Sequence, residues 1–332
     1  MSFKNAQALP LKSNSEISDT PPPRIIRTCC SFGSDVKVTG IPFLKVSDIT
    51  SIEKLGVHKY LRNDEENNGI IYTKFGGFID IGHLRDQADW TAYLFMRIAN
   101  SKSESFNIEL GREGGHKNLE ICASNLQTNA DKILLAGNIA YNLSVWHEIA
   151  TYYGASYIPM VPERYSAFSI EDAYSNLLGV KIGMEALKSK LPYEMAVTDL
   201  LAKTLAELEA VASAEDTHTA MESVLDLWWT RDAKLPSKNI LLKREFDIQN
   251  CLNPWLIQDL NSELNELCVP ELTSYGVSLN QFYELSIQLN SKFPVKRILP
   301  KEVKRVITQN DFEILINEAI RKESIHKAKN SL

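Results

Sequence analysis

The sequence predicts an α+β protein, in which a small mixed or antiparallel sheet packed with helices is followed by a mainly helical C-terminal half. Two observations predict this class. Short apolar segments bounded by turn residues occur between residues 25 and 123, which is typical of strands. After residue 129 the apolar residues recur mostly at three- and four-residue steps, which is typical of helices. With 332 residues, 44% of them hydrophobic, the chain is long enough for a substantial core.

We expect the chain to have three regions. Residues 1–24, which end in a run of three prolines and carry few apolar anchors, should be a flexible N-terminal arm. Residues 25–190 should form the α+β region that carries the candidate site. Residues 191–332 should be mainly helical and packed on it.

The strands are expected in the first of the two ordered regions. A glycine-rich connector, Gly111 to His116, suits the turn of a hairpin between the last two of them. The expected strands are Ile41 to Val46, Ile70 to Phe75, Phe78 to Ile81, Phe106 to Leu110 and Leu119 to Ala123.

The helices are expected wherever apolar periodicity is bounded by Gly, Pro or polar clusters. Leu235 to Phe246 alternates in character and should be a strand or an extended arm. The expected helices are Leu84 to Ala99, Asn129 to Tyr153, Ile170 to Lys188, Tyr193 to Ala212, Thr217 to Trp229, Leu279 to Leu289 and Asp311 to Lys327.

The helix from Asn129 to Tyr153 is the best defined of these. Thr128 can cap its start, with Asp131 in the capping-box position, and Gly154 supplies the left-handed residue that ends it. His147 lies within its apolar stripe. A His-Glu pair in such a place requires an explanation, because burying ionisable groups is costly.

The pair His147-Glu148 is half of the H-E-x-x-H zinc signature, in which two histidines bind the metal and the Glu acts as base. Thr151 stands where the second histidine would be. The alternative is a core histidine beside a surface glutamate.

A third ligand is available further along the chain. The thermolysin-like zincins use a Glu on a later helix, within the pattern Asn-Glu-x-x-Ser-Asp, and the stretch Glu171-Asp172-Ala173-Tyr174-Ser175-Asn176 resembles it. Asp172 could bind a metal, with Glu171 as its substitute, while Asn176 orients a ligating histidine. The alternative is that Ser169 and Asp172 form the capping box of the next helix.

His83 is the candidate that replaces the missing histidine. It stands where a strand is expected to end and a helix to begin, and helix N-termini disfavour the imidazolium, so the ring would be neutral and able to bind a metal. Asp86, one turn on, could hold the ring. The alternative is a histidine that only hydrogen-bonds a backbone group. His58 and His116 are expected to be solvent-exposed loop residues.

Charge and cysteine content exclude several classes of protein. The net charge of −6 argues against nucleic acid as a partner, and no apolar run is long enough to span a membrane. The first residues lack the apolar core of a signal peptide, so we expect a cytoplasmic chain. Five cysteines without a CxxC pair indicate mostly reduced structural thiols. Cys29-Cys30 could be a nucleophile site, but small buried cysteines are the stronger interpretation.

Four segments together resemble a known bacterial family, the domain of unknown function DUF4056. The resemblance covers most of residues 25 to 260. It implies no chemistry, because the family is largely uncharacterised. Many members look like exported lipoproteins, whereas this chain lacks a lipobox cysteine at its start. The four segments are Arg27 to Gly33, Gly76 to Trp90, Ser144 to Gly154 and Phe168 to Gly179.

The leading hypothesis is a divalent-metal hydrolase, zincin-like, that cleaves an amide or ester bond in a small-molecule or peptide substrate. Zinc is the first choice of metal and iron the second. Its ligands would be His83, His147 and Asp172, with Glu148 as the base. The same ligands would suit a non-haem iron oxygenase. The third hypothesis is a non-catalytic binding module whose metalloprotease-like site has degenerated.

Overall fold

The structure is a computed structural model, and it describes most of the chain beyond residue 49. The predicted strand Ile41 to Val46, the pair Cys29-Cys30 and nearly all of the predicted N-terminal arm lie outside the described residues. The described residues are 20–23, 25–27, 32–33, 49–122, 126, 128–155, 163–231, 240–257, 265–271, 276–290, 293, 298–299 and 305–330.

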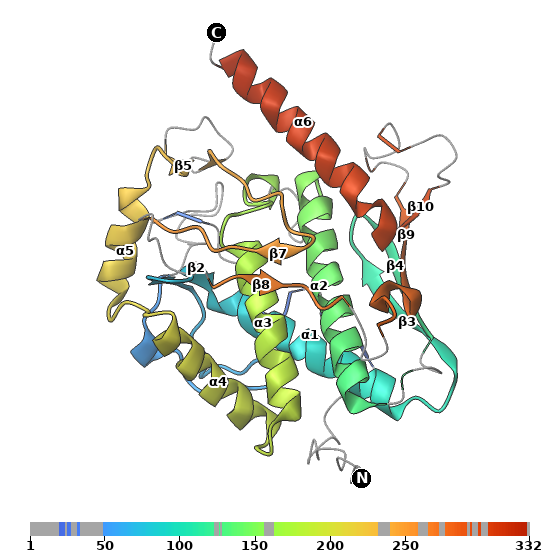
Figure 1. Cartoon of the computed structure of the whole chain (residues 1–332). Helices are drawn as coiled ribbons and strands as arrows, with labels where there is room; N and C mark the ends of the chain where they lie inside the picture. The colour runs from blue at the N-terminus through green and yellow to red at the C-terminus, as the bar shows by residue number, and fades with distance from the viewer. Residues whose placement is uncertain are drawn as a thin grey trace.

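Three helices form the centre of the molecule: α1 (Ile81–Asn100), α2 (Asn129–Tyr152) and α3 (Asp172–Lys188). Each packs against the other two (Figure 1). Most of their side chains are buried, on more than one face, because neighbouring elements cover them from several sides. Two further helices lie at one side of this core, α4 (Tyr193–Glu207) against α3 and α5 (Ala214–Ser223) against the first strand.

Two glycines of α3 set the distance between α3 and α1. A Cβ atom at Gly179 would lie 2.1 Å from the carbonyl oxygen of Leu84, and one at Gly183 would lie 2.9 Å from the Cα of Ala88. Backbones can approach this closely only where side chains are absent. The glycines thus allow α3 to lie close against the first two turns of α1, near the candidate site.

A four-stranded antiparallel sheet flanks the helices, in the order β10-β9-β4-β3 (Figure 1). Along β4 and β9 buried residues alternate with more exposed ones, as expected for a sheet with one covered face. The side chain of Trp146 on α2 lies near the rings of Phe293 and Phe312 beside this sheet. Its strands are β3 (Ser105–Arg112), β4 (Gly115–Cys122), β9 (Tyr283–Leu289) and β10 (Val306–Thr308).

Three two-stranded antiparallel sheets complete the described strands. In the first, β2 runs directly into α1. The helix α6 (Phe312–Asn330) contacts α2 and extends away from the rest of the molecule (Figure 1). The paired strands are β1 (Ile70–Thr73) with β2 (Gly77–Asp80), β5 (Trp229–Thr230) with β6 (Ile240–Leu241), and β7 (Cys251–Leu252) with β8 (Leu267–Cys268).

The α+β class and most predicted elements are confirmed, including the β3-β4 hairpin and the helix α2. Thr128 caps α2 as predicted, accepting from the backbone N–H of Asp131, and Gly154 has a positive φ. The helix predicted from Leu279 to Leu289 is wrong, because its residues from Tyr283 onward form β9, with buried residues at every second position. The helix predicted to reach Trp229 ends at Ser223.

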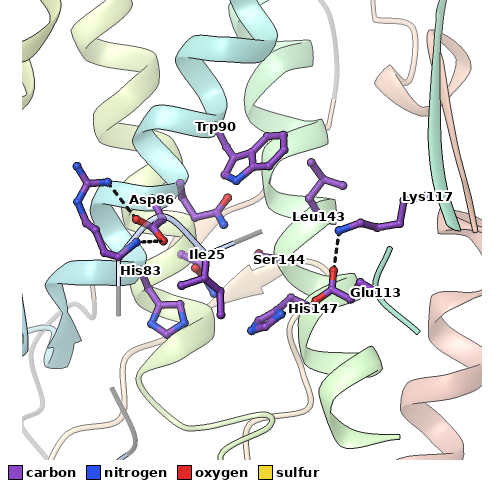
Figure 2. Close-up of a pocket in the computed structure, with 12 residues that line it drawn as sticks. Ile25, His83, Asp86, Trp90, Glu113, Lys117, Leu143, Ser144 and His147 are labelled. Atoms are coloured by element: carbon purple, nitrogen blue, oxygen red, sulfur yellow. Dashed lines mark hydrogen bonds and ion pairs between the residues drawn. The ribbon is translucent and has the colours of Figure 1, made fainter. Parts of the chain in front are cut away.

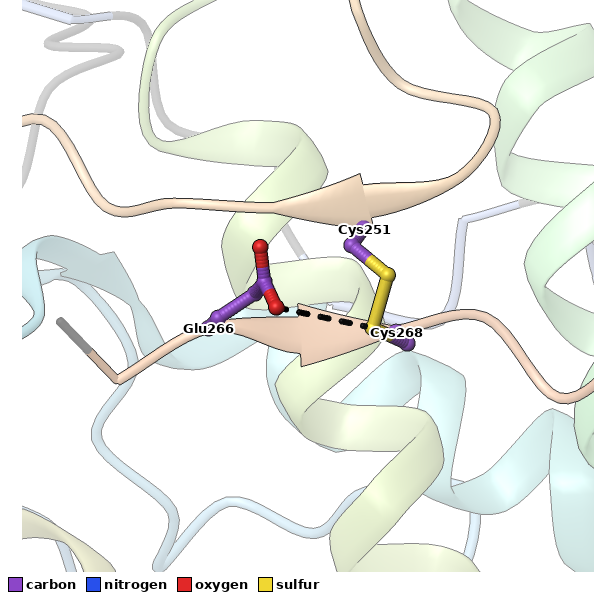
Figure 3. Close-up of a disulfide and its surroundings, with 3 residues drawn as sticks. All are labelled: Cys251, Glu266 and Cys268. Carbon is purple, nitrogen blue, oxygen red and sulfur yellow. Dashed lines mark hydrogen bonds between the residues drawn. A yellow bond between two sulfur atoms is a disulfide. The ribbon is translucent and has the colours of Figure 1, made fainter.

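The cysteine prediction needs correction. Cys251 and Cys268 lie opposite each other on β7 and β8 and form a disulfide (Figure 3), so they are not reduced thiols. Their pairing depends on strands that the sequence did not reveal. Disulfides persist in oxidising compartments and are rare in the cytosol.

None of the helices in the described part of the chain is both long enough and apolar enough to cross a membrane.

Candidate metal centre

Asp80, His83 and Asp172 form a cluster where α1 and α3 begin. The Nδ1 atom of His83 lies 3.2 Å from a carboxylate oxygen of Asp80 and 3.5 Å from one of Asp172. One ligand atom from each residue lies within 4.8 Å of the others. Both aspartates are buried, and the side chain of His83 is 11% exposed. The structure therefore brings together His83 and Asp172, as the sequence predicted.

Asp80 is the member that the sequence analysis missed. It caps α1 with one carboxylate oxygen, which accepts from the backbone N–H of His83, and its second oxygen is the one that faces the imidazole. Its own backbone N–H donates to the Ser175 hydroxyl of α3. An aspartate in the N-cap position, three residues before a histidine, could have predicted both the helix cap and the contact with His83.

Glu171 adds a third buried carboxylate beside this cluster. The pKa of Glu171 is raised to about 8, mainly by burial and to a smaller extent by the nearby Asp80 carboxylate, although the hydrogen bond from the Ser169 hydroxyl opposes the shift. The alternative reading of Ser169 and Asp172 as a capping box is wrong, because Ser169 donates to Glu171 and the side chain at the N-cap position makes no capping bond. Within the described chain, no Lys or Arg forms an ion pair with Asp80 or Glu171.

A pocket opens beside the cluster, with the side chains of His83 and His147 extending into it from α1 and α2 (Figure 2). Asn176 and Gln87 supply buried amide groups with atoms that have no hydrogen-bond partner among the described residues. The residues that line the pocket are Ile25, Arg27, His83, Asp86, Gln87, Trp90, Glu113, Lys117, Leu143, Ser144, His147 and Asn176.

His147 does not belong to the cluster that could bind a metal, although the sequence predicted it as a ligand. Its Nδ1 atom lies 2.7 Å from the carboxylate of Glu113, whose other oxygen accepts from the Lys117 ammonium at 2.6 Å. Glu113 lies in the β3-β4 hairpin. The sequence predicts only a turn for that loop, and no local pattern indicates that its glutamate reaches α2.

Glu148 is not placed to act as the base that the sequence predicted. It emerges on another face of α2, is 3% exposed, and accepts a hydrogen bond of 2.6 Å from the backbone N–H of Phe168. It does not line the pocket. Phe168 has a φ of 56°, so the glutamate holds a left-handed backbone turn in the segment that leads to α3. The geometry gives Glu148 a structural role.

Three supporting residues also differ from their predicted roles. Asp86 does not hold His83; it accepts from the backbone N–H groups of Ile26 and Arg27 and from the Arg27 guanidinium. Burial raises the pKa of Asp86 to about 6, although Arg27 opposes the shift. Asn176 lines the pocket but bonds no histidine among the described residues, and the buried Thr151 hydroxyl has no partner there either.

His58 is also not the exposed loop residue that was predicted. It is fully buried, and its Nε2 atom lies 3.0 Å from the carboxylate of Asp89. Asp89 in turn binds Arg27, so these groups form an ionic network that fastens the segment before β1 to α1. The network explains how so many charges are buried.

A second group of potential ligands, Cys251, Glu266 and Cys268, is closed to metals while the disulfide stands (Figure 3). Thiolates bind metals, whereas the sulfur atoms of a disulfide are uncharged and are not thiolate ligands.

Comparison with known proteins places the chain in a family. The sequence model described as "Protein of unknown function (DUF4056)" matches residues 17–258. The chain belongs to the DUF4056 family. No curated protein and no solved structure matches it. Asp80, His83, Glu113, His147 and Asp172 all lie within the matched span.

Proposed function

We propose that this DUF4056 protein is a divalent-metal-dependent hydrolase of an amide or ester bond, with the cation held by Asp80, His83 and Asp172. The observation that carries the proposal is the spacing around His83 Nδ1, which is 3.2 Å and 3.5 Å from two carboxylate oxygens. Ligand atoms about 2.0 to 2.2 Å from one zinc ion lie roughly 3 to 4 Å from one another. A bound cation would also favour the ionised form of Glu171, which could then serve as a further ligand.

The donor set favours some metals over others. One imidazole nitrogen with carboxylate oxygens suits Zn²⁺, which supplies Lewis-acid chemistry by polarising a carbonyl and acidifying a water molecule. The iron oxygenases use two histidines and one carboxylate, whereas the described cluster contains a single histidine. The hydrolase proposal is therefore preferred to the oxygenase. It does not depend on a zincin-like arrangement, which would need His147 and Glu148 at the metal.

The pocket supports a polar substrate. The amides of Asn176 and Gln87 are buried, and they can donate to or accept from the peptide or ester groups of a ligand. Trp90 and Leu143 supply apolar surface on the same pocket. This mixture is typical of sites for small molecules and short peptide segments.

The test is a zinc titration by calorimetry, using protein purified without a histidine tag and treated with chelator. We expect one zinc site per chain in the wild type and a loss of more than about 100-fold in affinity for Asp172→Asn, because ligand removal should exceed the effect of altering a supporting residue. Asp199→Asn, which changes an exposed aspartate on α4, is the matched control and should bind normally.

Uptake of less than about one-tenth of a metal per chain, with zinc and with ferrous iron, would end the proposal. In that case the contacts of His83 with Asp80 and Asp172 would be a structural interaction without a metal. The binding module, the third of the hypotheses drawn from the sequence, would then remain.

A further inference from the structure

We propose that His147 is the proton-accepting residue of the pocket and that Glu113 is the residue that positions it. This inference rests on the proposed hydrolase function and deepens it, because Glu148 is turned away from the pocket. It also changes the role of His147 from that of a metal ligand to that of a base.

The placement of Glu113 is unusual for a hairpin residue. Charged residues in turns are ordinarily solvated, yet Glu113 is 3% exposed. Its backbone N–H donates to the carbonyl of Gly115 at 2.7 Å, and its own carbonyl accepts from the indole N–H of Trp146 at 3.1 Å. Gly114 has a φ of 63°, and a Cβ there would lie 2.9 Å from the ring of Phe293. These contacts of the turn hold the Glu113 carboxylate in a buried position.

Lys117 is the counterion of Glu113. It stands at an inward-facing position of β4, opposite Ile287 of β9, where apolar residues follow at Leu119 and Ile121. Its ammonium lies 2.6 Å from Glu113 and is almost fully buried. A buried pair of charges seldom improves stability over apolar residues, so stability alone does not account for this pair at the pocket wall.

The contact between Glu113 and His147 defines which ring nitrogen of His147 carries a proton. A carboxylate only accepts hydrogen bonds, so the Nδ1 atom of His147, 2.7 Å from Glu113, must carry a proton. In the neutral ring the lone pair then belongs to Nε2, and the ring lines the same pocket as His83 (Figure 2). In carboxylate–histidine catalytic pairs, too, the carboxylate accepts a hydrogen bond from one ring nitrogen and leaves the other nitrogen unprotonated.

The step that this arrangement serves is the hydrolysis of an amide or ester. As the oxygen of water bonds to the carbonyl carbon, His147 Nε2 takes one proton from that water. As the bond between the carbonyl carbon and the leaving nitrogen or oxygen breaks, the imidazolium returns this proton to the leaving atom. The products are a carboxylic acid and an amine or alcohol, and His147 is regenerated neutral.

The experiment is a nitrogen-15 NMR measurement of the histidine tautomer, with the His147 signals identified by their loss in His147→Gln. The wild type should show a protonated Nδ1 and an unprotonated Nε2. In Glu113→Gln, Lys117 should bind the amide oxygen and turn the amide NH₂ towards His147, so the proton should move to Nε2. Glu109→Gln changes an exposed glutamate of the same hairpin and should leave the tautomer unchanged.

Zinc binding separates a base from a ligand. His147→Gln should bind zinc as the wild type does, whereas His83→Gln should lose more than about 100-fold in affinity. A wild-type His147 protonated at Nε2, or a His147→Gln protein that has lost zinc, would overturn the inference. If Glu113→Gln does not fold, the tautomer of His147 in the wild type alone tests the inference. A wild type that binds no zinc refutes the metal site, while the tautomer still reports on Glu113.

Discussion

Replacing Glu171 by Gln should make the stability of the metal-free protein less dependent on pH. The carboxyl group is buried against Asp80, and its pKa rises from 4.5 to about 8. Each unit of pKa difference corresponds to about 1.4 kcal/mol, so the shift of Glu171 amounts to at most about 5 kcal/mol of unfolding free energy. A typical domain has about 5–15 kcal/mol, so the change should be readily measured.

The sign follows from proton linkage. Between pH 4.5 and about 8 the folded protein keeps the Glu171 proton that the unfolded chain has lost, so the folded state binds more protons. This contribution to stability is complete below the unfolded pKa and is lost as pH rises through the folded one. The wild type should therefore lose stability across this window, relative to Glu171→Gln. Asp86, whose pKa is about 6, acts equally in both proteins and cancels.

The assay is urea unfolding with chelator present, at about pH 5 and about pH 8, on the two proteins. Glu53→Gln, at an exposed glutamate, is the control and should follow the wild type. Saturating zinc should remove most of the wild-type dependence, since a bound cation favours the ionised carboxylate. Equal pH dependence of the wild type and Glu171→Gln would mean that this carboxyl is ionised at neutral pH without a metal, and the reasoning would fail.

Three further predictions concern the scaffold. Gly179→Ala should cost at least about 3 kcal/mol in urea unfolding and weaken zinc binding, because the new methyl group meets the backbone of α1; near-normal stability would refute the close helix contact. Glu148→Gln should lose about 1–2 kcal/mol of stability with unchanged zinc affinity, and loss of zinc would return Glu148 to the site. Cys251→Ser should lower stability by about 3 kcal/mol, as loop closure over a separation of 17 residues predicts. Reductant should have no further effect on this variant, and a reductant-sensitive variant would contradict the pairing with Cys268.

Local patterns predicted the parts of the fold that depend on nearby residues. The helix α2, its Thr128 cap and the β3-β4 hairpin each depend on a few neighbouring positions, and all three were correctly placed. The segment from Tyr283 to Leu289 was misread as a helix, because its apolar residues fit two periods over so short a length, and pairing with β4 selects the strand.

The site shows the same division. His83 and Asp172 were predicted to lie together from residue type and helix position, and the structure brings them together; the position of Asp80 beside them could have been predicted by the same reasoning. Glu113 could not, because its contact with His147 spans 34 positions and requires the hairpin to fold over α2. Glu148 was misassigned because a motif specifies a residue's neighbours in sequence, whereas its direction depends on the Phe168 segment.

The measurement that tests the metal site most directly is anomalous diffraction at the zinc edge from crystals of the zinc-loaded protein. We predict a single strong anomalous peak at the start of α1 and α3, about 2.0 to 2.2 Å from His83 and from carboxylate oxygens of Asp80 and Asp172, with His147 outside the ligand shell. A peak at Cys251, Glu266 and Cys268 alone, or no peak beside His83 in zinc-loaded crystals, would contradict the assignment.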